Sequence, residues 1–193
     1  MARLDELLSE VRMTTGDRIH GNMFVGLYRM VQEYYNSDFV VVEIGNFQGA
    51  STELFALTCK HVYAVDPYTS GFSTAISESD LIMAEACFIE RMKNYPNVTK
   101  LRKPSVEASK GFEDGSVDAV YIDGDHNYEA VIDDMNAWMP KLKPTGILSG
   151  HDINDDKVSS AVESIIGMRY KGFIDFSWAA RMEKILEWKE KRE

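Results

Sequence analysis

A series of short apolar runs extends along this chain, each separated from the next by a segment of helix length. Five runs carry β-branched residues: FVVVEIG (39–45), HVYAVD (61–66), NVTKLRK (97–103), VDAVYID (117–123) and GILSGHD (146–152). Strands that alternate with helices form βαβ units around a mostly parallel sheet. A run as continuously apolar as FVVVEI suits a sheet that helices cover on both faces. The sequence therefore predicts an α/β fold of the doubly wound type.

Helices are predicted between these strands, because apolar residues recur there at helical spacing. The predicted segments are about 51–60, 77–94, from 106 onward, 128–139 and 156–167. Two closing strands are expected near 170–176 and 181–188, which brings the sheet to seven strands. Tyr128 and Trp138, in the helix before Pro140, are expected to pack in the core.

The part of the chain before the first strand reads as a helical extension. Residues 3–12 and 22–35 each place leucine, valine, phenylalanine or methionine on one face of a predicted helix. No repeat, low-complexity tract or linker divides the chain. We therefore predict a single domain over 1–193, with an N-terminal helical extension (1–36) and a Rossmann-like core (38–193).

The composition limits the kinds of partner. Of 193 residues, 45% are apolar and 27% charged, and the formal net charge is −10. This charge argues against nucleic acid and anionic membranes, which bind basic surfaces, and favours a small-molecule substrate. Cys59 and Cys87 lie far apart and predict reduced thiols. The start, MARLDELLSE, lacks a signal-peptide pattern, so we expect a cytoplasmic protein, and apolar faces on the two N-terminal helices are compatible with a homodimer.

A glycine turn follows the first strand. VVVEIGNFQGAST (40–52) places Glu43, Gly45 and Gly49 in the order E-x-G-x-x-x-G. The first glycine permits a sharp turn, and the second lets backbone approach a ligand where free N–H groups point out of a helix start. The same pair is also compatible with a tight strand-to-helix turn that binds nothing.

The second strand ends in an acid that fits a nucleotide site. Asp66 follows Gly45 by 21 residues, the spacing at which a carboxylate reaches the hydroxyls of a bound ribose. Its alternative role is to cap a turn beside Pro67. The glycine turn and the acid together favour an adenosine-type cofactor. A dinucleotide is disfavoured, because Phe47 and single glycines replace the G-x-G-x-x-G that accommodates a pyrophosphate.

These segments resemble the class I S-adenosylmethionine-dependent methyltransferases. VEIGNFQGAS is similar to the first motif of that family and VYAVDPY to its second. The segment VYIDGDHNYEAVIDDMNAWMPKLKPTGILSGHDI (120–153) resembles a subgroup of small-molecule and sugar O-methyltransferases with an I-D-G-D-H-x-Y sequence and a later H-D. The resemblance extends over about residues 38–190. It implies a Rossmann-like, seven-stranded, mostly parallel sheet and S-adenosylmethionine as cofactor.

The resemblance also implies roles for individual residues. Four of them would wrap the methionine part of the cofactor: Gly45, Asn46, Phe47 and Gly49. Glu43 would support that loop or the amino group of the cofactor, and Asp66 would hold the ribose. Ser105 would lie near the adenine ring, although it could instead cap a helix. The predicted cofactor-binding set also includes Ser51, Pro67 and Asp123.

Acids and histidines follow the fourth and fifth strands. Asp123, Asp125 and His126 come after the fourth strand, and His151 and Asp152 after the fifth. Carboxyl ends of neighbouring parallel strands meet at one edge of a sheet, so we expect these residues to lie together. His126 is the predicted general base, because its ordinary pKa lies near working pH. Asp125 would orient it or act as the base itself, and either residue could instead cap the following helix.

In related metal-dependent methyltransferases, acids after these two strands bind a divalent cation. Asp123 and Asp152 match two of those positions, and His151 stands where an acid is usual. The resemblance thus implies Mg²⁺ or Mn²⁺ on Asp123, Asp152 and His151. Because His151 departs from the family pattern, both the identity of the metal and the dependence of the reaction on a metal are left open.

These observations predict O-methylation of a small hydroxylated acceptor, such as a sugar, polyketide or phenol, with a divalent cation as a candidate aid. The alternatives are a non-catalytic S-adenosylmethionine-binding or S-adenosylhomocysteine-binding module and a nicotinamide-dependent oxidoreductase. The acceptor pocket is expected to come from the N-terminal helices, the loops at the strand ends and the loop 67–76, where Tyr68 and Phe72 could close over a ligand.

Overall fold

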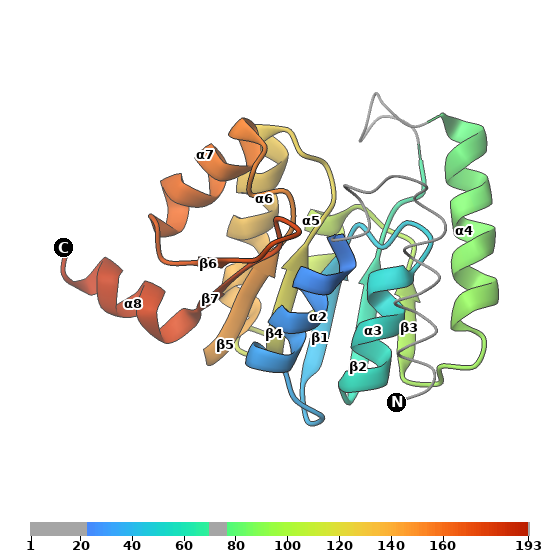
Figure 1. Cartoon of the computed structure of the whole chain (residues 1–193), viewed down its shortest axis with the longest axis horizontal. Helices are drawn as coiled ribbons and strands as arrows, with labels where there is room; N and C mark the ends of the chain where they lie inside the picture. Colours follow the sequence, from blue (N-terminus) through green and yellow to red (C-terminus); the bar gives the residue numbers. More distant parts are fainter. Residues whose placement is uncertain (1–22, 70–76, 193) are drawn as a thin grey trace.

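A computed structural model of the chain describes residues 23–69 and 77–192. The strands form one seven-stranded sheet in the order β3-β2-β1-β4-β5-β7-β6 (Figure 1). The strands are β1 Val40–Ile44, β2 His61–Val65, β3 Val98–Leu101, β4 Val117–Ile122, β5 Leu142–Gly150, β6 Lys171–Gly172 and β7 Trp178–Arg181. The first five pair in parallel, whereas β7 runs antiparallel to both β5 and β6. The predicted Rossmann-like, mostly parallel seven-stranded sheet is confirmed.

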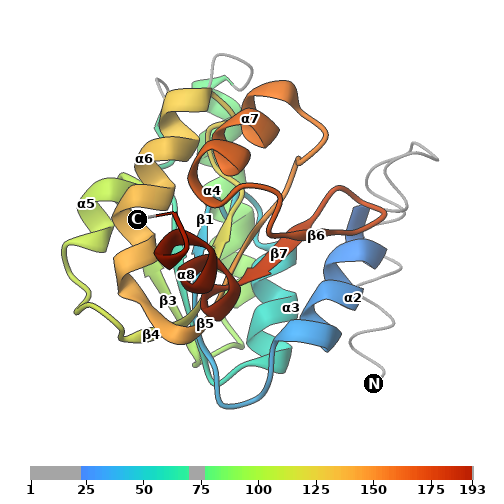
Figure 2. The same cartoon turned by 90° about the vertical axis from the view of Figure 1, so that its left-hand side faces the viewer.

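Helices cover both faces of the sheet (Figures 1 and 2). Their bounds are α2 Met23–Tyr34, α3 Ala50–Thr58, α4 Glu78–Met92, α5 Ser105–Ser109, α6 Tyr128–Trp138, α7 Asp156–Ile166 and α8 Met182–Glu190. Helices α2, α3 and α4 pack on one face and α5 to α8 on the other. The fully buried neighbours Val41 and Val42 belong to the two opposite cores, as a strand apolar on both faces requires.

Most predicted elements lie where the sequence pattern placed them, but the C-terminal end differs. The strand predicted near 181–188 is wrong, because α8 occupies this stretch and the strand β7 lies just before it. Met182 and Ile185 are buried three residues apart, and Lys184 pairs with Glu187 across one turn. Both spacings are those of a helix rather than of a strand.

The N-terminal extension is described only in part. Helix α2 falls within the predicted 22–35 and buries Phe24, Leu27, Met30 and Val31 against the sheet. The helix predicted at 3–12 and Phe72 lie outside the described residues. Within 23–69 and 77–192, every helix is too short or too polar to cross a membrane.

The strand order creates one position suited to ligands. The strand order reverses between β1 and β4, which are parallel neighbours in the centre of the sheet although five elements (α3, β2, α4, β3 and α5) lie between them in the chain. In open α/β sheets, ligands bind beyond the carboxyl ends of the strands at this switch point. The glycine turn after β1 and the acids after β2, β4 and β5 all lie at that edge.

Candidate active site

Gly45 joins the loop after β1 to the loop after β4. Its backbone φ is +81°, and a Cβ atom there would lie 2.0 Å from the carbonyl oxygen of Asp123. Its N–H donates to the carbonyl of Val65 at 2.9 Å. Only glycine satisfies both the positive φ and the close approach, so the two loops meet here through backbone alone.

Gly49 ends the same loop and begins α3. It also has a φ of +81°, and its N–H donates to the carbonyl of Asn46 at 2.7 Å. An added Cβ would lie 2.8 Å from the ring of Phe88 in α4. The second glycine is therefore required by packing against α4 as well as by the turn.

Glu43 is fully buried near the end of β1 and supports the glycine loop through hydrogen bonds to the helix that follows it. Its two carboxylate oxygens accept short hydrogen bonds from the hydroxyls of Ser51 and Thr52 in the first turn of α3. Burial raises the pKa of Glu43 to about 8, although the two hydroxyl donors favour the charged form. Glu43 and Ser51 thus support the loop, one of the two roles that the resemblance implied for Glu43.

Asp66 connects the end of β2 to the glycine loop. Its carboxylate accepts hydrogen bonds from the backbone N–H of Phe47 at 3.1 Å and from that of Tyr68 at 2.8 Å. Burial raises the pKa of Asp66, and the backbone donors oppose that rise. Asp66 and Pro67 are half-buried, and both carboxylate oxygens of Asp66 serve the turn.

Tyr68 fastens the other side of the loop. Its hydroxyl lies 2.5 Å from Oδ1 of Asn46 and 2.8 Å from the carbonyl oxygen of Phe47. Asn46 is 1% exposed, and its Nδ2 atom has no hydrogen-bond partner among the described residues. The sequence placed Tyr68 in a loop that closes over a ligand, whereas the structure buries it and leaves the donor group of Asn46 free for one.

Ser105, expected either near adenine or as a helix cap, is the first residue of α5. The residue at the capping position is Pro104, so the capping alternative is wrong. The hydroxyl of Ser105 instead accepts a hydrogen bond from the indole nitrogen of Trp138 at 2.8 Å. Trp138 is fully buried, as predicted, whereas Tyr128 is 37% exposed rather than packed in the core.

Three side chains from the loops after β4 and β5 converge. His126 Nε2 lies 3.2 Å from Oδ2 of Asp152 and 3.7 Å from Oδ1 of Asp123. One possible ligand atom from each of the three residues lies within 4.8 Å of the others. We call Asp123, His126 and Asp152 the edge cluster. The prediction that the parallel strands bring these two segments together is confirmed.

His151 lies behind the edge cluster rather than in it. Only 8% of the residue is exposed, and its Nδ1 is 3.2 Å from Oδ2 of Asp152. Burial opposes its charge, but contact with Asp152 and the nearby Asp123 and Asp175 raise the pKa of His151 to about 9. The predicted metal set is Asp123, Asp152 and His151, whereas the structure groups His126 with the two carboxylates and places His151 behind Asp152.

The charges of the edge cluster are coupled. Burial raises the pKa of Asp123, while burial of Asp152 is outweighed by the two histidines, which lower the pKa of Asp152. Contact with the carboxylate of Asp123 raises the pKa of His126 against the effect of its partial burial. His126 is therefore held near the two carboxylates with a strengthened affinity for a proton.

Asp125 takes part in the turn that leads into α6. Its Oδ1 accepts hydrogen bonds from the backbone N–H and from the side-chain amide of Asn127, at 2.9 and 2.7 Å. The groups that contact His126 are Asp123 and Asp152, so the structure gives the orienting role predicted for Asp125 to them. Its predicted role as a base stays a prediction.

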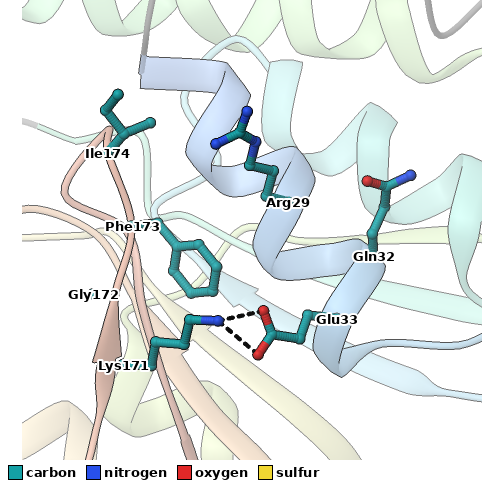
Figure 3. A pocket seen from close by; sticks show the side chains of 7 residues that line it. All are labelled: Arg29, Gln32, Glu33, Lys171, Gly172, Phe173 and Ile174. Atoms are coloured by element: carbon teal, nitrogen blue, oxygen red, sulfur yellow. Dashed lines mark hydrogen bonds and ion pairs between the residues drawn. The ribbon is translucent and has the colours of Figure 1, made fainter.

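Two hollows lie near these elements. A small cavity beneath the edge cluster is lined by Asp123, His126, His151 and Trp178, among others. A larger groove of about 510 Å³ runs between α2 and the β6 segment and includes Arg29, the ion pair of Lys171 with Glu33, and Ile174 (Figure 3). The larger groove shares no residue with the edge cluster, and its volume alone does not make it the site of chemistry.

Comparison with known proteins identifies related sequences. A family model described as a methyltransferase domain matches residues 42–153. An uncharacterised protein of Sinorhizobium fredii is 32% identical over 119 residues, which is 58% of this chain. The chain spans only 13% of the length of that curated relative.

Solved structures share the fold at low identity. A SAM-dependent methyltransferase from Aquifex aeolicus has a TM-score of 0.59 and 12% identity, over 90% of this chain and 96% of that one. A methyltransferase-like protein from Streptococcus mutans, solved in complex with SAH, has a TM-score of 0.60 and 12% identity, over 80% and 94%. A SAM-dependent O-methyltransferase from Thermotoga maritima has a TM-score of 0.52 and 16% identity, over 75% and 48%.

Proposed function

This chain belongs to the methyltransferase domain family, and we propose that it transfers a methyl group from S-adenosylmethionine to a hydroxyl oxygen of a small acceptor. The observation that carries this proposal is the contact between the two halves of the site. Gly45, in the predicted cofactor loop, packs directly against the backbone of Asp123, which belongs to the edge cluster. A methyl donor on that loop would lie beside groups able to take a proton.

The residues present fit this cofactor. Asn46 offers a buried N–H₂ group with no partner among the described residues, and the carboxylate end of an amino acid is a suitable acceptor for it. The carboxylate of Asp66 lies at the end of β2, where a ribose would meet it. In this proposal Gly45, Asn46 and Gly49 bind the methionine part, and Ser105 lies toward the adenine.

The reaction is an in-line displacement. The bond between the sulfonium sulfur and the methyl carbon breaks and leaves its electron pair on sulfur, while the acceptor oxygen forms a new bond to that carbon. The hydroxyl proton must leave the oxygen, and Nε2 of His126 receives it. The carboxylates of Asp123 and Asp152 stabilise the resulting imidazolium at 3.7 and 3.2 Å.

The edge cluster could alternatively bind a divalent cation. Two carboxylates and one imidazole form a donor set that suits Mn²⁺ and, less well, Mg²⁺. A cation bound there would lower the pKa of a hydroxyl in contact with it. His126 Nε2 cannot be a metal ligand and accept a proton at once, so the two uses exclude each other.

Calorimetric titration with S-adenosylhomocysteine tests the proposal. We expect micromolar binding that Asp66→Ala weakens at least tenfold, about 1.4 kcal/mol. Turnover of a hydroxylated acceptor should then fall with His126→Ala. Binding without turnover by any acceptor would favour a non-catalytic binding module. No detectable binding of S-adenosylhomocysteine would overturn the proposal, and binding of NADH instead would favour the oxidoreductase.

A further inference from the structure

Strained backbone is confined to one edge of the described part of the molecule. Four residues other than glycine have positive φ: Phe47 (41°), Tyr68 (48°), Asp152 (55°) and Phe176 (67°). Positive φ is unfavourable for side chains with a Cβ and is enriched at functional sites. Phe47, Tyr68 and Asp152 already belong to the cofactor loop, its support and the edge cluster. Phe176 has no role yet.

Phe176 lies beside the edge cluster although 24 residues separate it from Asp152. Its carbonyl oxygen accepts a hydrogen bond from the backbone N–H of Ile153 at 3.1 Å, and Ile153 directly follows Asp152. Two adjacent segments with positive φ are thus joined by one hydrogen bond.

The turn that carries Phe176 is fixed from the other side as well. Asp175 is 1% exposed, and its carboxylate accepts hydrogen bonds from the backbone N–H of Leu27 in α2 at 2.5 Å and of Ser177 at 3.1 Å. Phe173 N–H donates to the carbonyl of Ser177 at 2.8 Å. The turn is therefore anchored to α2 and to the loop after β5.

The ring of Phe176 is not needed for this anchoring. The residue is 38% exposed, and the hydrogen bonds at the turn come from backbone atoms and from Asp175. Glycine or asparagine would adopt the same φ at lower free energy. An exposed phenylalanine in an unfavourable conformation beside a reactive cluster indicates a side chain kept for a ligand.

We propose that Phe176 is a specificity-determining residue that binds the flat apolar face of the acceptor ring. The proposal rests on the proposed function and assigns a substrate class to it: a ring that carries hydroxyl groups and has one apolar face. A phenol and the C–H face of a pyranose share this chemistry. Tyr128, 37% exposed and two residues after His126, is a second exposed aromatic residue at the same edge.

The test uses the whole chain saturated with S-adenosylhomocysteine. Catechol and methyl glucoside serve as probes, and their binding is followed by saturation-transfer NMR and calorimetry. We expect one of them to bind and Phe176→Gly to weaken that binding about tenfold, the effect of losing one stacking contact. The melting temperature should not fall. The bound probe distinguishes the phenol from the sugar.

Ile174→Ala is the matched control. Ile174 lies in the same turn and is 59% exposed, but its side chain lines the groove beside α2 (Figure 3), so probe binding should stay unchanged. The inference is overturned if neither probe binds at millimolar concentration, or if Phe176→Gly binds the probe as well as the unaltered chain. It is also overturned if Phe176→Gly and Phe176→Asn both lower the melting temperature, because the ring is then structural. Failure to bind S-adenosylhomocysteine would instead reject the proposed function.

Discussion

The carboxylate of Asp66 accepts a hydrogen bond from the backbone N–H of Phe47, with 3.1 Å between oxygen and nitrogen. The end of β2 thereby holds the loop that follows β1, 19 residues earlier in the chain. The same carboxylate also accepts from Tyr68 N–H, and Tyr68 in turn contacts Asn46. The acid predicted to hold a ribose is therefore also part of the structure that shapes the cofactor loop.

This double role predicts two measurable losses for Asp66→Ala. Binding of S-adenosylhomocysteine should weaken at least tenfold, and the free energy of unfolding should fall by about 1–3 kcal/mol, because two backbone donors lose a charged acceptor. Calorimetry and urea unfolding measure the two effects separately. Asp66→Asn keeps one acceptor oxygen and should lose less stability than Asp66→Ala. A variant that is as stable as the unaltered chain would contradict the supporting role.

Alanine substitutions at three glycines separate the destabilisation caused by a steric clash from that caused by a positive φ. Gly45→Ala would bring a methyl group to 2.0 Å from the carbonyl oxygen of Asp123 and should prevent folding or destabilise the protein by at least about 3 kcal/mol. Gly115 has a φ of +66° with open space around it, so Gly115→Ala should cost about 1 kcal/mol. Gly172→Ala has neither feature and should be neutral. Thermal and urea unfolding of the three variants would check this order.

Glu43 predicts a specific pH dependence of stability. Its pKa is about 8 in the folded chain, above the ordinary value of 4.5, so the folded state holds a proton that the unfolded chain releases first. The contribution to stability is therefore full below pH 4.5 and is lost as the pH rises toward 8, on the order of 4 kcal/mol. Glu43→Gln, which cannot titrate, should have a flatter stability profile across this interval.

Urea unfolding at several pH values measures this difference. Ser51→Ala removes a hydroxyl that favours the charged form of Glu43, so the loss of stability should extend to higher pH. Equal slopes for Glu43→Gln and the unaltered chain between pH 5 and 8 would show that burial does not perturb this carboxyl.

The sheet could be predicted because the apolar pattern of each strand indicates its burial and the residue that follows the strand indicates which edge of the sheet it reaches. Val41 and Val42 are both apolar since the strand is covered on two faces, and Asp66, Asp123 and Asp152 mark strand ends at one edge. The closing segment was less predictable. Trp178 begins a strand of only four residues, and the apolar residues of α8 are few, so the helical spacing of Met182 and Ile185 carried little signal.

Residue types predicted the position of the edge cluster but not its internal arrangement. His151 directly follows β5 and is drawn into the interior, whereas His126 lies four residues beyond β4 and folds back over the carboxylates. Asp125 forms a local turn with Asn127. In the sequence alone, such an aspartate beside a histidine cannot be told from a catalytic acid. Phe176 had no sequence signal, because only the backbone conformation shows that it is strained.

The choice of histidine leads to a prediction about divalent cations. If Asp123, His126 and Asp152 bind Mn²⁺, titration monitored by electron paramagnetic resonance should show one site that Asp123→Asn, Asp152→Asn and His126→Ala each weaken about tenfold or more. His151→Gln should have a smaller effect, because His151 contacts the ligand Asp152 rather than the ion. Asp125→Asn is the matched control and should bind normally, since its carboxylate is engaged by Asn127.

The same titration separates the two uses of His126. A ligand imidazole must be neutral, and Asp123 raises the pKa of His126, so Mn²⁺ binding should strengthen as the pH rises through the range in which His126 loses its proton. His126→Ala should abolish that part of the pH dependence. If Mn²⁺ fails to bind the unaltered chain while His126→Ala still removes methyl transfer, then His126 acts on the proton and the carboxylates serve only to hold its charge.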